Sequence, residues 1–200
     1  MIKKFINPFE YIAGVNSLGL GILILLLTSV IGYFSNTHFP DLISVKVNPN
    51  YSVLQIMAEC LSNWLIVSIL FYLAAIIFSK SSIRLIDIFG TQALARSPYL
   101  FASLVGFSNS MNTFGRYLVW TYMKQGEPVE ITTFQIIIAL MLTVFVILLT
   151  IWLIILMFNA FKVSANLKGI KLSIIFIVVL IISMIFSVFT NKLFLQGLLT

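Results

Sequence analysis

Few residues of this chain could do chemistry, and the densest group of them precedes its midpoint. Arg84 and Asp87 are three residues apart, which places both on one face of a helix. Gln92 and Arg96, four apart, share another face, and Pro98 follows them. Side chains of these types can hold a ligand or a protein partner through charge-assisted hydrogen bonds. The alternative is an interfacial helix whose charges pair with each other or with lipid headgroups.

A second group of polar residues follows the longest apolar run. Asn159, Lys162 and Asn166 are three and four residues apart, so they continue one helix past its apolar part. They are further candidates for binding a partner, against the alternative of a helix end with a snorkelling lysine. Glu59 and Asn63 are four apart near the outer end of another apolar run, where an acid pairs with a neighbouring helix or sits among headgroups.

The chemistry that the sequence excludes is broader than the chemistry that it offers. Cys60 is the only cysteine and His38 the only histidine, which rules out an intrachain disulfide, a multi-cysteine cluster and a histidine-rich metal site. We find no paired aspartates, no serine with a histidine or lysine partner, and no glycine-rich phosphate loop. We therefore expect no catalytic residue, no cofactor, no metal and no enzymatic activity.

Composition identifies the solvent as lipid. Hydrophobic residues make up 60% of the 200 residues and charged residues 9%, with a mean hydropathy of +1.11. A soluble fold has no place to hide so much apolar surface. The net charge of +6 is scattered, so no basic stripe follows a phosphate backbone, and nucleic-acid binding is excluded. We expect membrane lipids as partners and leave protein partners and further copies of the chain open.

Five stretches without a charged residue or histidine can supply the roughly 20 apolar residues that a bilayer crossing needs. The third opens at Pro98 and has a polar far end, which makes it short, tilted or partly re-entrant. We predict one domain, residues 1–200, with the fold of an all-α integral membrane protein and about five transmembrane helices in a single bundle. The predicted spans are about 17–34, 61–78, 99–114, 134–158 and 172–189.

Residues 1–16 are predicted to form a short interfacial segment. Asn7, Pro8 and Glu10 follow the order of a helix start, in which Asn caps, Pro takes the first helical position and Glu reaches back. A helix lying on the membrane directs Phe9 toward the acyl chains and the preceding lysines toward headgroups. The alternative is an extension of the first transmembrane helix.

The positions of the cations predict the orientation. With five spans and a cytoplasmic N-terminus, eight of the twelve Lys and Arg residues fall on the inside and four on the outside. Because Lys and Arg are retained on the cytoplasmic side, we predict a cytoplasmic N-terminus and an external C-terminus. A re-entrant third stretch would move the C-terminus inside and weaken this bias.

Three segments of the chain together resemble the Yip (Ypt-interacting protein) domain family, and in particular its compact bacterial members. They are NPFEYIAG (7–14), DIFGTQALARSPY (87–99) and FNAFKVSANLKG (158–169). The resemblance implies five helices, a cytoplasmic N-terminus and the inner membrane of a bacterium. Eukaryotic members act in vesicle traffic and contact Rab-type GTPases through a longer hydrophilic N-terminal region. This chain has about sixteen residues there, which argues against GTPase binding.

The functional hypothesis follows from these features. We predict a non-enzymatic membrane protein that organises the bilayer or recruits partners through cytoplasmic faces near residues 80–96 and 162–171. The rival is a small transporter, channel or lipid-handling protein in which the broken third helix lines a path, because irregular backbone at membrane depth must line a cavity or be buried in protein.

Overall fold

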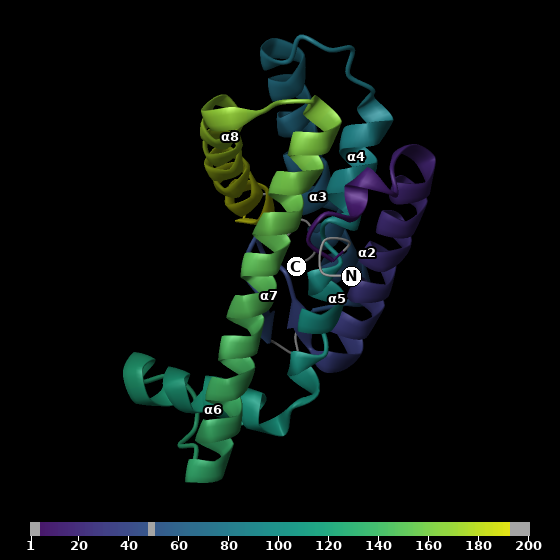
Figure 1. Ribbon diagram of the computed structural model, residues 1–200. Helices are drawn as coiled ribbons and strands as arrows, with labels where there is room; N and C mark the ends of the chain where they lie inside the picture. The colour runs from purple at the N-terminus through teal and green to yellow at the C-terminus, as the bar shows by residue number, and fades with distance from the viewer. Residues whose placement is uncertain (1–4, 48–50, 193–200) are drawn as a thin grey trace.

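The computed structural model describes residues 5–47 and 51–192 and shows a helical bundle with one short β-hairpin (Figure 1). Four described helices are long and apolar enough to cross a membrane, with 22 to 33 residues each. At a rise of about 1.5 Å per residue they exceed the bilayer core of about 30 Å. The predicted all-α membrane bundle is confirmed. The four helices are α2 (Gly14–Ser35), α3 (Val53–Phe78), α7 (Thr133–Ala165) and α8 (Gly169–Thr190).

The ends of these helices carry ordinary capping signals. Ser52 and Gln55 form a capping box at the start of α3, and Thr132 heads the same arrangement at the start of α7. Helices α2 and α7 stop at Asn36 and Asn166, which take left-handed backbone with φ of 58° and 49°. The predicted spans 17–34, 61–78, 134–158 and 172–189 lie within the four observed helices.

The predicted third span, 99–114, is not one helix. Residues 85–118 form four short helical pieces instead. Pro98 has no N–H for the Leu94 carbonyl, which accepts from the Ser97 N–H at 3.1 Å, so the helix tightens and restarts. Ser108 then takes an extended backbone with ψ of 117°. The pieces are α4 (Leu85–Leu94), α5 (Pro98–Ala102), the 3₁₀ turn η2 (Val105–Phe107) and α6 (Asn109–Leu118).

The first three of these pieces together run parallel to α2. A Cβ atom added to Gly90 on α4 would lie 2.8 Å from the Gly14 carbonyl oxygen, at the start of α2. At the other end, Ser35 donates a hydrogen bond to the Ser103 carbonyl, and a Cβ atom on Gly106 would reach the Ser35 carbonyl oxygen. The segment α4–α5–η2 is therefore a third pass of the chain, made by a broken helix that α2 accompanies from end to end.

The described chain traverses the bundle five times. We call the end at which α2 and α4 begin the N-side end, and the end that carries the β-hairpin and α6 the hairpin end. Helix α2, the segment α4–α5–η2 and α8 run toward the hairpin end, and α3 and α7 return (Figure 1). Lys171 at the start of α8 meets the Phe78 carbonyl at the end of α3, which fixes the antiparallel pairing of these helices.

The predicted N-terminal segment is described from residue 5 onward, and residues 5 and 6 are helical. Residues 1–4 of the predicted interfacial segment lie outside the described residues. Pro8–Glu10 form a single 3₁₀ turn, η1, and the Asn7 side chain donates to Glu10 Oε1 at 2.8 Å without capping the backbone. Phe9 is buried in the bundle, so its predicted contact with acyl chains is wrong. The capping pattern here produced a turn that docks on protein.

The loop that follows α2 contains a short β-hairpin. Strands β1 (Thr37–His38) and β2 (Lys46–Val47) pair antiparallel, with His38 opposite Lys46. After α6, a π-helical turn η3 (Val119–Met123) and an exposed loop lead into α7. The hairpin places His38 and Phe39 against α3, where the principal polar cluster of the bundle lies.

Candidate functional site

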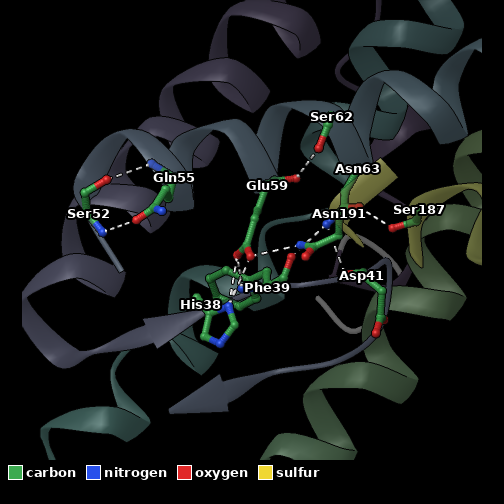
Figure 2. Close-up of polar contacts among 10 residues, drawn as sticks. All are labelled: His38, Phe39, Asp41, Ser52, Gln55, Glu59, Ser62, Asn63, Ser187 and Asn191. Atoms are coloured by element: carbon green, nitrogen blue, oxygen red, sulfur yellow. Dashed lines mark hydrogen bonds and ion pairs between the residues drawn. The ribbon is translucent and has the colours of Figure 1, made fainter. Parts of the chain in front are cut away.

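Glu59 on α3 is the centre of a buried polar network at the hairpin end (Figure 2). Its side chain is 1% exposed. One carboxylate oxygen accepts from the backbone N–H of Phe39 at 2.9 Å, and the other from Asn191 Nδ2 at 3.0 Å. His38 Nδ1 lies 3.1 Å from the carboxylate. The acid is thus surrounded by nitrogen atoms from the hairpin and from the end of α8.

His38 is held in one orientation by its surroundings. Because an ionised carboxylate only accepts hydrogen bonds, the network assigns the proton on Nδ1 to the bond with Glu59. The ring stacks on Tyr51 with its centroid 3.8 Å from the tyrosine centroid. The residue is 2% exposed, yet Nε2 has no hydrogen-bond partner among the described residues. A histidine arranged in this way offers one ring nitrogen to a ligand or a proton.

Asn63 extends the network one turn further into α3. Its Nδ2 donates to the carbonyls of Phe39 and Asp41 at 2.9 and 3.1 Å, and its Oδ1 accepts from Ser187 on α8 (Figure 2). The side chain amide is therefore satisfied on both sides. Asn63 fastens the loop after β1 to two transmembrane helices at once.

Arg96 lies at the break between α4 and α5 and is 2% exposed. Within the described residues its guanidinium makes one hydrogen bond, from Nη2 to the Asn63 carbonyl at 3.3 Å, and Nε has no partner. No carboxylate lies within ion-pair distance of it in the described part of the chain. A charge at membrane depth costs at least about 2.5 kcal/mol, which makes it a functional candidate by default.

Gln92, one turn before Arg96, is buried as well. Its Nε2 donates to the Met157 carbonyl of α7 at 3.2 Å, while Oε1 has no hydrogen-bond partner in the part of the chain that the structure describes. Pro98 is buried at the first position of α5. The sequence predicted a helix near the membrane surface for residues 80–96, but its second half lies inside the bundle. Gln92, Arg96 and Pro98 cannot present a surface to a partner.

Asp87 and Arg84 remain at the N-side end. Arg84 is exposed, and Asp87 is half-buried in the first turn of α4. Ser164 donates to the Asp87 carbonyl at 3.2 Å and hydrogen-bonds Thr91 at 2.8 Å. Arg84 and Asp87 form no ion pair with each other in the region that the structure covers. The backbone of Asp87 therefore joins α4 to α7.

The candidates on α7 also lie at the N-side end. Asn159 Nδ2 donates to the Ile6 carbonyl at 2.9 Å, and Asn166 Nδ2 donates to Ser81 Oγ at 3.0 Å. Lys162 is exposed between them. Two of the three predicted residues therefore fasten other segments to α7, and Lys162 is the member with a free amine at the surface.

The predicted candidates separate into two sites. Those at the N-side end are Arg84, Asp87, Asn159, Lys162 and Asn166, whereas Gln92, Arg96 and Pro98 belong to the interior. Sequence reasoning missed the pairing of His38 with Glu59 because the two are 21 residues apart and meet only through the hairpin. The spacing of Glu59 and Asn63 was the signal that could have drawn attention to it.

A scan against protein-family models, a search of curated proteins and a search of solved structures each found no match. Fold and site alone therefore define the class. The chain is an integral membrane protein with several apolar helices, and its interior carries a polar network around Glu59 and Arg96.

Proposed function

We propose that the chain is a non-enzymatic multi-pass membrane protein that organises the bilayer or recruits partners through its N-side end, which we place in the cytoplasm. The observation that carries this proposal is the convergence there of three segments far apart in sequence. A Cβ atom on Gly14 would lie 3.6 Å from Asp87 Oδ1, and Ser164 bonds both Thr91 and the Asp87 carbonyl. These are the segments that carry the resemblance to the Yip domain family, and we propose membership in that family on this basis.

Exposed cations surround this convergence point. Among the described residues, the N-side end carries five exposed Lys and Arg side chains, and its acids are Glu10 and Asp87. Basic residues near a membrane surface attract anionic lipid by about 1 kcal/mol each. Such a face suits anionic headgroups or an acidic protein partner, and its charge supports a cytoplasmic location in a bacterial inner membrane. The five cations are Lys80, Arg84, Lys162, Lys168 and Lys171.

The test is purification of the tagged protein in mild detergent from its native membrane, with identification of partners by mass spectrometry. We expect a partner that is retained by the wild type and lost in the double variant Arg84→Glu and Lys162→Glu. The control is Lys124→Glu with Lys192→Glu, which reverses two exposed charges at the hairpin end. If the same partners, or none, are recovered with all three proteins, recruitment through the N-side end is wrong.

A second candidate is a transporter, channel or lipid-handling protein. The broken third pass and the unpaired polar atoms Gln92 Oε1 and Arg96 Nε support it, because such groups inside a bundle mark solute or ion paths. Solute flux in proteoliposomes that is lost in Gln92→Leu, with thermal stability retained, would favour this function over the first. If neither the wild type nor Gln92→Leu shows solute flux, the transport function is wrong.

A further inference from the structure

A cavity of about 910 Å³ lies at the hairpin end, away from the proposed partner surface. The β-hairpin forms one wall, α6 another, and the loop before α7 closes part of the rim. Thr143 also lines it, ten residues into α7, or about 15 Å along the helix at about 1.5 Å per residue. The cavity therefore extends from an exposed loop along a helix that faces lipid.

Two cations line this cavity, one from the hairpin and one from α6. Lys46 lies directly across the two-stranded ladder from His38, so both side chains project from the same face of the hairpin. Arg116 faces the cavity from α6. Neither Lys46 nor Arg116 forms an ion pair within residues 5–47 and 51–192. Glu127 on the loop is the one carboxylate in the lining, so the described lining has an excess of positive charge.

His38 adds a buried side chain to the cavity wall, and its Nε2 has no partner among the described residues. It lines the cavity although it is 2% exposed, and Glu59 fixes its Nδ1. Figure 2 shows the second ring nitrogen pointing away from Glu59. In the neutral ring with the proton on Nδ1, Nε2 carries a lone pair, which accepts a hydrogen bond from a hydroxyl group. Anion recognition by Lys46 and Arg116 is thereby combined with a fixed acceptor.

Helix α6 supplies both polar and apolar lining. Met111, Phe114 and Leu118 recur at helical spacing along the cavity. Asn109, Asn112 and Arg116 form a polar row on the other side of α6, and both rows contribute to the lining. A soluble anion contacts only the polar row, whereas an amphiphile at the membrane interface contacts both the polar and the apolar row. The cavity suits a charged headgroup that is attached to hydrocarbon.

We propose that this cavity binds an anionic glycerophospholipid whose headgroup carries a hydroxyl. Arg116 and Lys46 hold the phosphate, His38 Nε2 accepts the hydrogen bond of the hydroxyl, and the acyl chain lies along the apolar row of α6. The neighbouring bilayer supplies the ligand. The site is independent of recruitment at the N-side end.

The experiment measures lipid retention by the full-length chain with native mass spectrometry, using phosphatidylglycerol and phosphatidylcholine as probes. We expect the double variant Lys46→Gln and Arg116→Gln to retain phosphatidylglycerol at least about tenfold more weakly, because it loses two charge-assisted contacts. Lys124→Gln with Lys192→Gln is the matched control. Both are exposed cations at the same end outside the cavity lining, and we expect them to leave retention unchanged. Equal retention by wild type and the cavity variant overturns the site.

Two further comparisons use the unmodified protein, so that misfolding of a variant cannot affect them. Phosphatidylmethanol has the same charge as phosphatidylglycerol and lacks the headgroup hydroxyl, and we expect weaker retention of it. Equal retention of the two lipids overturns the role of His38 Nε2. Free glycerol phosphate should not displace the lipid. Complete displacement would show a site for a soluble anion and overturn the assignment to a lipid.

Discussion

At the scale of single residues, the carboxylate of Glu59 joins three parts of the chain. Its hydrogen bonds reach the backbone of Phe39, the His38 ring and the end of α8 at Asn191, all shielded from solvent. A buried acid with several N–H donors is stabilised where an isolated one would be costly. The network therefore fixes the hairpin against α3 and α8 and keeps His38 in the cavity wall.

Replacing Glu59 with Gln tests this role. The amide places an NH₂ group opposite N–H donors, so at least one hydrogen bond is lost inside the bundle. We expect the free energy of unfolding to fall by about 2 to 4 kcal/mol. Thermal unfolding in detergent measures the change, with Glu130→Gln, an exposed acid near the start of α7, as control. Equal destabilisation by both substitutions would contradict the role of Glu59.

Arg96 leads to the opposite expectation. Its guanidinium makes one described hydrogen bond and has an unsatisfied Nε, so its desolvation is poorly compensated. Arg96→Met keeps the volume and removes the charge, and we expect stability to stay level or to rise by up to about 4 kcal/mol. The same thermal assay applies. A clear fall in stability would mean that Arg96 contributes to the fold through interactions that the structure does not contain.

At the scale of elements, the contact between α2 and α4 depends on small side chains. A Cβ atom at Gly21 would lie 2.4 Å from Ala93 Cβ and 2.6 Å from the Leu94 backbone nitrogen, so the helices would have to separate. In lipid no hydrophobic effect drives helices together, so their association depends on close van der Waals packing, which small residues allow. Ser17 and Gly21 are two small residues four positions apart in the sequence, a spacing that favours close helix contact without showing which helix is the partner.

Gly21→Ala should therefore destabilise the bundle by about 1 to 3 kcal/mol through overpacking. Gly19 is a matched control on the same helix, because a Cβ atom there meets nothing within 4 Å. Gly19→Ala should be neutral or slightly stabilising, since alanine favours the helix. The two variants are compared by thermal unfolding in the same detergent. A neutral Gly21→Ala would mean that α2 and α4 are not in close contact.

The sequence predicted the helices better than it predicted which residues lie inside the bundle. Long uncharged runs fixed four helices, and Pro98 indicated that the third was unusual. The run 99–114 nevertheless contains no charge, so composition could not show the interruptions after Ala102 and at Ser108, which depend on backbone hydrogen bonding. A surface position for Gln92 and Arg96 was equally compatible with the sequence. These residues are buried only because α4 packs against α2, α3 and α7.

At the scale of the whole molecule, the five passes give the two ends different chemistry. The N-side end gathers exposed cations around three converging segments, and the hairpin end holds the Glu59 network and the cavity. The third pass links them, with Arg96 near its middle. This separation requires that the broken segment α4–α5–η2 cross the membrane completely, and the functional proposals for both ends depend on that crossing.

Cysteine accessibility in intact membrane vesicles tests that crossing most directly. The buried Cys60 is first replaced by Ala, and single cysteines are then introduced at the exposed positions Lys80, Lys124 and Lys168. We predict that an impermeant maleimide labels Lys80→Cys and Lys168→Cys from the cytoplasmic side and Lys124→Cys from the opposite side. Labelling of Lys80→Cys and Lys124→Cys from the same side would show that the third segment does not cross, and would contradict the five-pass architecture.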